Sequence, residues 1–132
     1  MSVSFLDHQD PLNPLNGRRF QSGADLATVL ADLRARPPFF CEIIGDKGFK
    51  QLLGVGPGQC CVQHSASSGE PPYLMAVGDS KAPLDEYVEF LSGNTLTPVA
   101  RRYCVSFDLM TEVVVHFVAH GDRLPTLEWE EI

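Results

Sequence analysis

Two segments of the chain place apolar residues at the three- and four-residue spacing of a helix face. Ser22 suits the cap at the start of the first segment, and Pro37 and Pro38 stop its run. The apolar stripe that this helix would bury consists of Leu26, Val29, Leu30 and Leu33. The pattern predicts a first helix between Ser22 and the two prolines, with one face against a sheet.

A second helical stripe lies near the end of the chain. Ser106 suits its N-terminal cap, and Asp108 places a negative charge at the positive end of the helix dipole. Gly121 can adopt the positive φ that ends a helix, and Pro125 prevents the helix from resuming. The stripe consists of Met110, Val113, Val114, Phe117 and Val118.

Short apolar or β-branched runs, separated by glycine- and proline-rich turns, predict a series of strands. The expected strands are 39–44, 51–55, 59–64, 73–77 and 86–91, an extended segment over 101–105, and a half-buried last strand around Leu127 and Trp129. Connections this short cannot hold crossover helices, so neighbouring strands should pair antiparallel. The prediction is an α+β fold, with a mostly antiparallel sheet of about five to seven strands covered by two main helices.

The chain of 132 residues has the length of one domain, so a single domain is expected over residues 1–132. Residues 10–16 hold two prolines and two asparagines, and residues 1–19 are therefore expected to form a loosely held N-terminal arm. No apolar run approaches the length that crosses a bilayer, and the first residues do not resemble a signal peptide. These features favour a cytoplasmic protein without a membrane partner.

The charge is unevenly distributed along the chain. The net formal charge is −7, and residues 1–66 contribute nothing to it because they hold six acidic and six basic residues. Residues 67–132 hold eleven acidic and four basic residues, which gives 4 − 11 = −7. Such a field repels nucleic acid and attracts a basic partner, although the same charge would also serve solubility alone.

The acidic second half also contains the residues that best fit a protein interface, where aromatic anchors combine with orienting charges. The candidate partner-binding residues are Glu70, Tyr73, Asp79, Asp85, Glu86, Tyr87 and Glu89. The alternative for this region is a solvated, charged edge that prevents aggregation.

Catalysis and metal binding have weaker candidates. His116 and His120 stand four residues apart on the second helix, but Phe117 occupies the position where zinc proteases place a glutamate, and no third ligand is evident. The pair Cys60 and Cys61 with His64 lacks an obvious orienting acid. We therefore expect no enzyme activity, no cofactor and no metal. A small metal- or ligand-binding domain is the alternative.

The C-terminal motif gives a more specific indication. The helix after Ser106, the stop at Gly121, the segment Arg123-Leu124-Pro125 and the strand with Trp129 resemble the ending of an immunity protein family of bacterial polymorphic toxin systems. The resemblance covers roughly residue 39 to the C-terminus. It includes the strand Phe-Phe-Cys-Glu-Ile-Ile and the segment Glu89-Phe-Leu-Ser-Gly-Asn94 before Thr97-Pro98.

This family is named for toxins of the nucleic-acid deaminase type, and bacteria encode its members beside their toxins. The resemblance implies a protein that binds a cognate toxin domain and blocks its active site, without chemistry of its own. The implied partner is a basic, nucleic-acid-acting deaminase, because an enzyme that holds nucleic acid presents positive charge. The residues Gly121, Pro125 and Trp129 are expected to have structural roles.

Overall fold

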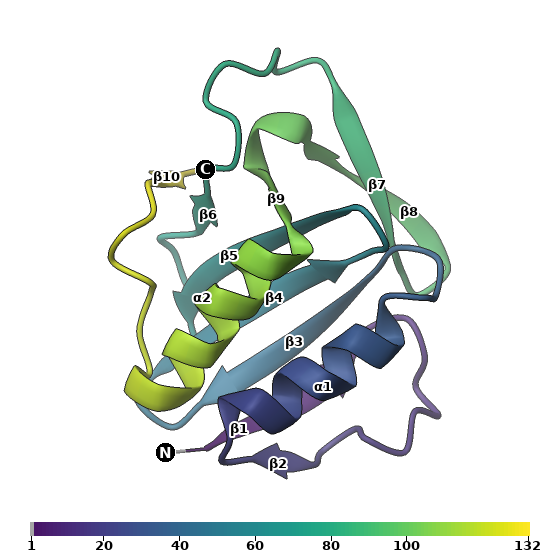
Figure 1. Ribbon diagram of the computed structural model, residues 1–132, viewed down its shortest axis with the longest axis vertical. Coiled ribbons are helices and arrows are strands. Elements are labelled where there is room, and N and C mark those ends of the chain that lie inside the picture. Colours follow the sequence, from purple (N-terminus) through teal and green to yellow (C-terminus); the bar gives the residue numbers. More distant parts are fainter. Residues whose placement is uncertain (1) are drawn as a thin grey trace.

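The computed structural model describes residues 2–132, and in them ten strands form one sheet that is accompanied by two helices (Figure 1). The strands are β1 (Val3–Asp7), β2 (Arg19–Phe20), β3 (Phe39–Gly45), β4 (Phe49–Val55), β5 (Gln59–Ala66), β6 (Leu74–Ala76), β7 (Tyr87–Ser92), β8 (Thr95–Ala100), β9 (Cys104–Ser106) and β10 (Trp129–Glu131). The helices are α1 (Gly23–Leu33) and α2 (Phe107–His120), with a short 3-10 helix, η1, at Arg101–Tyr103. The predicted α+β class is confirmed, but the sheet has more strands than the five to seven expected.

The helices begin and end where the sequence predicts. The Ser22 side chain accepts a hydrogen bond from the backbone N–H of Asp25 at 3.2 Å, and the Ser106 side chain accepts one from Leu109 at 3.1 Å. These bonds satisfy amide groups that have no partner within the first turn of a helix. Gly121 ends α2 with a φ of 72°. Both helices lie on the same side of the sheet, next to each other (Figure 1).

Strands β3, β4 and β5 form the centre of the sheet as an antiparallel meander. Cys41 lies opposite Leu53, and Leu53 lies opposite Val62, so these three buried side chains share the face that the helices cover. The order across the sheet is β10-β6-β5-β4-β3-β1-β2, with β9 also paired to β5. The hairpin of β7 and β8 joins through a parallel contact between Phe39 and Leu91.

The structure corrects the prediction of a loosely held arm over residues 1–19. Strand β1 pairs along its whole length with β3, and Val3 and Phe5 are buried in the core beneath the helices. The evidence for this strand is its pairing with β3, more than 30 residues away along the chain, which a local sequence pattern does not reveal. Met1, the first residue of the predicted arm, lies outside the described residues.

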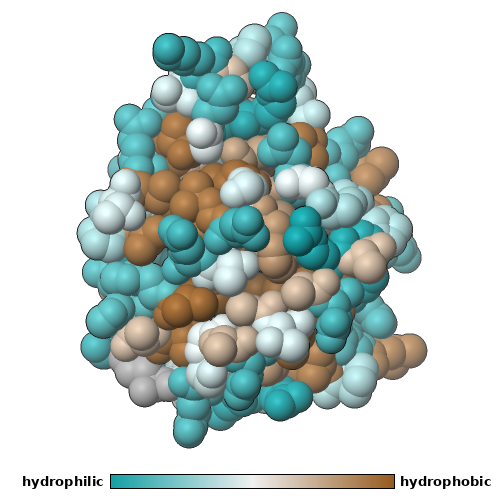
Figure 2. Space-filling view, viewed as in Figure 1, coloured by the Kyte–Doolittle hydropathy of each residue, from teal (hydrophilic) through white to brown (hydrophobic). Residues whose placement is uncertain are grey.

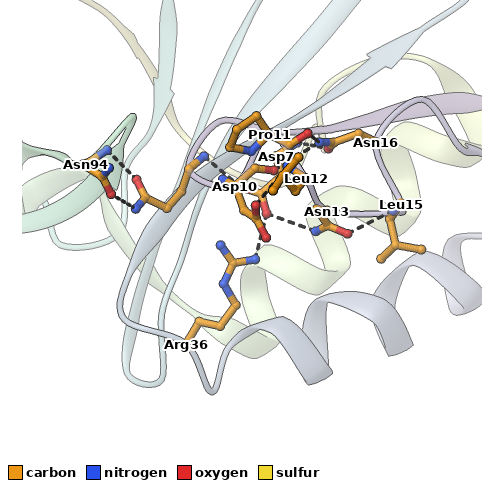
Figure 3. Close-up of polar contacts among 10 residues, drawn as sticks. Asp7, Asp10, Pro11, Leu12, Asn13, Leu15, Asn16, Arg36 and Asn94 are labelled. Carbon is orange, nitrogen blue, oxygen red and sulfur yellow. Dashed lines mark hydrogen bonds and ion pairs between the residues drawn. The ribbon is translucent and has the colours of Figure 1, made fainter.

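The turn-rich segment after β1 is held by Asp7, whose carboxylate is completely buried (Figure 3). Its Oδ1 accepts hydrogen bonds from the backbone N–H groups of Gln9 and Asp10, at 2.8 and 2.9 Å. Its Oδ2 accepts from Asn13 Nδ2 at 3.0 Å and from Arg36 Nη1 at 2.7 Å. Burial alone would raise the pKa of Asp7, but these four hydrogen bonds outweigh it and lower the pKa. The segment is therefore fixed to the end of α1.

The two faces of the sheet carry separate apolar clusters. The larger one fills the space between the sheet and the two helices, and the smaller one, on the opposite face, consists of Phe40, Cys61, Met75 and Phe90. The hairpin of β7 and β8 covers one end of this second face, and the ring centroids of Phe40 and Phe90 lie 5.3 Å apart. Within residues 2–132, no helix covers the remainder of this face, which we call the open face.

Candidate functional site

The segment between β6 and β7 forms a loop at one end of the molecule, and it carries much of the acidic surface predicted from the sequence (Figure 1). Asp79, Asp85 and Glu86 are exposed on this loop, and Tyr87 and Glu89 are exposed on β7. Figure 2 shows this end of the molecule as hydrophilic. The structure thus places five of the seven predicted partner-binding residues on one continuous segment, which we call the acidic loop (residues 79–89).

Arg101 joins two of the acidic side chains. Its Nε lies 3.0 Å from Glu86 Oε2, and its Nη2 lies 3.9 Å from Asp79 Oδ2. These exposed ion pairs contribute little to stability, but they partly neutralise the loop. Asp85 and Glu89 make no ion pair with any residue from 2 to 132, so they provide the uncompensated charge of the acidic loop.

The other two predicted residues lie on a different loop, between β5 and β6. Glu70 is exposed, whereas Tyr73 is half-buried and its hydroxyl donates a hydrogen bond to the Gly69 carbonyl at 2.5 Å. Tyr73 lines a depression of about 190 Å³ on the open face, together with Glu42 and Lys50. The seven predicted residues therefore form two groups rather than one cluster.

A buried carboxylate that the sequence analysis missed lies in this depression. Glu42 is only 6% exposed, and its two oxygens each lie 2.8 Å from a partner, one from His8 Nε2 and the other from Lys50 Nζ. The hydrogen bond with His8, assisted by Lys50, outweighs burial and lowers the pKa of Glu42. His8 is 34 residues away in the sequence, so no local pattern indicates this contact.

An apolar groove of about 450 Å³ continues along the open face from this depression. Phe40, Leu52 and Met75 lie along it, with Tyr103 and Ile132 on one side and strand β8 on the other. The sequence analysis missed this groove as well. Its only local signal is the nearly continuous apolar run of β3, which is typical of a strand with two apolar faces.

The three residues predicted to be structural lie where the chain returns from α2 to β10. Gly121 provides the left-handed residue after the helix, and Pro125 is exposed in the following turn. Trp129 is half-buried against the core on the helix side, and its Nε1 donates a hydrogen bond to the Leu124 carbonyl at 3.1 Å. The indole thus connects the turn to the sheet.

A second buried polar pair lies beneath this turn. His64 is 2% exposed, and its ring lies near the rings of Phe49 and Trp129, with centroids 4.8 and 6.1 Å away. Its Nδ1 lies 3.2 Å from Gln51 Nε2, and its Nε2 lies 3.7 Å from Asp122 Oδ1, too far for a hydrogen bond. Burial lowers the pKa of His64 to about 4, although the Asp122 carboxylate opposes the shift.

This shift predicts a loss of stability in mild acid. An unfolded histidine has a pKa of about 6.5, so below this pH the unfolded chain binds a proton that the folded chain does not. The contribution of His64 is complete above pH 6.5 and falls as the pH decreases toward 4, by about 2 kcal/mol at pH 5. Chemical denaturation at pH 7 and pH 5 should show a smaller loss for His64→Gln than for the unmodified protein. Equal losses would contradict the prediction.

The side chains considered for catalysis or metal binding are arranged as follows. The four cysteines are free and buried. Burial raises the pKa of the Cys61 thiol well above its usual value, and it raises the pKa of the Cys104 thiol to about 11. These shifts disfavour the thiolate that a nucleophile requires.

The rings of His116 and His120, the pair considered for metal binding, lie 4.5 Å apart. Within residues 2–132, no three His, Cys, Asp or Glu side chains are grouped to hold a metal ion, and neither helix there is long and apolar enough to cross a membrane.

Comparison with known families gives a match over nearly the whole chain. The model of the family described as Immunity protein Imm1 matches residues 16–131, which include every element from β2 to β10. The match extends further toward the N-terminus than the resemblance visible in the sequence. A search of curated proteins finds no match.

Proposed function

The chain belongs to the Imm1 family of immunity proteins, and on this basis we propose that it binds a cognate toxin domain and neutralises it by covering the toxin's active site. The family match over residues 16–131 is the observation that carries this proposal. The protein acts by binding and contributes no chemistry of its own.

The acidic loop is the first part of the proposed contact surface. Asp85 and Glu89 present uncompensated negative charge, and Tyr87, which is 58% exposed, supplies an aromatic side chain between them in the sequence. Tyrosine residues are enriched among the side chains that dominate binding energy, whereas charges at an interface mainly accelerate and orient association. Glu70 and Tyr73 extend the proposed surface toward the open face.

The proposed toxin is a nucleic-acid deaminase. An enzyme of this class must hold the phosphate backbone of its substrate near a catalytic pocket, and it uses basic groups to do so. The net charge of −7 lies in residues 67–132, so this half of the chain is suited to approach such a basic surface. Carboxylates of the acidic loop would then occupy positions that phosphates occupy in the substrate.

Reversing the uncompensated charges is predicted to slow association. The double variant Asp85→Lys and Glu89→Lys should bind the toxin domain with a rate constant lowered about 10-fold or more, with weaker salt dependence, because electrostatic attraction speeds encounter. Stopped-flow association at low and physiological salt measures this effect.

A matched control has the same change of charge elsewhere. Asp32→Lys with Asp46→Lys also reverses two exposed carboxylates that make no ion pair with the described residues, but it does so in the neutral half of the chain. Equal slowing by both double variants would show that overall charge, and not the acidic loop, governs association.

The activity of the toxin is tested directly with the toxin domain encoded beside the gene of this protein. Purified toxin domain should deaminate single-stranded DNA or RNA, and one equivalent of this protein should abolish the reaction. Deamination that persists with excess protein would contradict neutralisation. Inhibition of a toxin with a different activity would preserve the immunity function and overturn the deaminase assignment.

A further inference from the structure

The apolar groove on the open face has the features of an anchor site for a partner side chain. Its floor includes Phe40, Leu52 and Met75, and Phe40 and Met75 belong to the apolar cluster that no helix covers. Tyr103 and Val99, beside the floor, are only half-buried. An apolar hollow open to solvent is costly to hydrate, and burying it beneath a partner would be favourable.

The strand that borders the groove is poorly suited to pair with another strand. Among the described residues, strand β8 pairs only with β7, through a two-residue turn at Gly93 and Asn94 in which both φ angles are positive. Counted from this turn, the pairs between β7 and β8 alternate between hydrogen-bonded and non-hydrogen-bonded. Pro98 belongs to a non-hydrogen-bonded pair, so its backbone nitrogen faces the free edge of the sheet. Proline has no N–H to donate, so it interrupts the edge. A partner would therefore use a side chain, rather than a backbone strand, to fill the groove.

The charge of the segments around the groove indicates the character of that partner. Residues 67–100, which form β6, the acidic loop and the β7–β8 hairpin, hold five acidic residues and one lysine. None of these acidic side chains lines the groove itself, and Arg101, the next residue, pairs with Asp79 and Glu86. Residues 67–101 therefore have a net charge of 2 − 5 = −3. This combination suits a partner whose apolar side chain projects from a basic surface.

A polar rim completes this surface. The depression with Glu42, His8 and Lys50 shares Leu52 and Gln63 with the groove, so the two hollows are continuous. The charges of Glu42 and Lys50 neutralise each other, which leaves hydrogen-bonding groups next to an apolar floor. Stable interfaces commonly have this arrangement of an apolar centre and a polar margin.

We infer that the groove on the open face is the anchor site for the cognate toxin domain and receives an apolar side chain from a basic surface of that toxin. This inference rests on the proposed function, because the toxin is the partner. It adds Phe40, Leu52, Met75 and Tyr103, none of which the sequence indicated, to the contact surface. The open face, and not the acidic loop alone, then determines how long the complex lasts.

A pair of tryptophan variants on adjacent residues of β8 tests the inference. Thr97 is half-buried and lines the groove, whereas Leu96 is 56% exposed and belongs to the opposite face of the hairpin. Thr97→Trp should fill the groove and weaken binding of the purified toxin domain by about 30-fold or more, the usual loss when a central anchor is removed. Leu96→Trp should change the dissociation constant by less than about 3-fold.

The outcomes separate this inference from the proposed function. Calorimetric titration with the unmodified protein tests the function, since absence of binding would overturn both. If folded Thr97→Trp binds the toxin domain normally, the anchor site in the groove is contradicted, whereas the proposed immunity function is not. If Thr97→Trp does not fold, Ser92→Trp fills the groove from β7 and should give the same loss. Thermal unfolding of each variant identifies which ones are folded.

Discussion

Replacing Asp7 with alanine is expected to lower the free energy of unfolding by about 3–5 kcal/mol, because several hydrogen-bond donors lose their buried acceptor, at about 1–3 kcal/mol for each group left unsatisfied. The Asp7 carboxylate is completely buried and accepts four hydrogen bonds. Its removal leaves Arg36 and Asn13 without their acceptor. The segment from β1 to β2 would then lose its attachment to the end of α1.

Urea unfolding monitored by circular dichroism measures this effect, with Asp46→Ala as the control. Asp46 is an exposed aspartate in the turn between β3 and β4, and it makes no hydrogen bond or ion pair through its side chain with the described residues. The control should change stability by less than about 0.5 kcal/mol. If Asp7→Ala were equally mild, the Asp7 carboxylate would not be what holds the segment between β1 and β2 in place.

Replacing Gly78 with alanine is expected to cost about 3 kcal/mol, the upper part of the range for overpacking. A Cβ atom at this position would lie 1.6 Å from the carbonyl oxygen of Cys104, so the backbone would have to move. The Gly78 N–H donates to the Arg102 carbonyl at 2.9 Å, and this contact fixes the start of the acidic loop. The variant should therefore displace the loop as well as destabilise the fold.

Gly58→Ala is the matched control, because a Cβ atom there would meet no heavy atom within 4 Å. The two variants add the same methyl group to an exposed glycine, so thermal unfolding of both isolates the contact with Cys104. Gly58→Ala should leave stability within about 1 kcal/mol of the original. Similar midpoints for the two variants would contradict the close approach of Gly78 to β9.

The sequence predicted those parts of the fold that depend on local patterns. The stripes of α1 and α2, their serine caps and the strands β3, β4 and β5 all appear where periodicity and turns placed them. Strand β1 was missed because its evidence is non-local, in its register against β3. Strand β8 contains Pro98, which argues against a central strand, and the structure accommodates it at a free edge.

The candidate surface was predictable only in part. Composition identified the acidic second half, and the resemblance indicated an immunity protein, which the family match confirms. The neutralisation of Asp79 and Glu86 by Arg101 depends on the tertiary fold, as does the separation of Tyr73 from the acidic loop. The groove was hidden because an apolar residue on an open face has the same local pattern as one in the core. The deaminase partner stays a prediction.

The central claim, that this protein neutralises a cognate toxin, is tested most directly by growth of bacteria that produce that toxin domain. Cells that produce the toxin domain alone should stop growing, and cells that also produce this protein should grow normally. Thr97→Trp should protect less well than Leu96→Trp at equal protein levels. Growth arrest that persists although the folded protein accumulates in excess would contradict the immunity function.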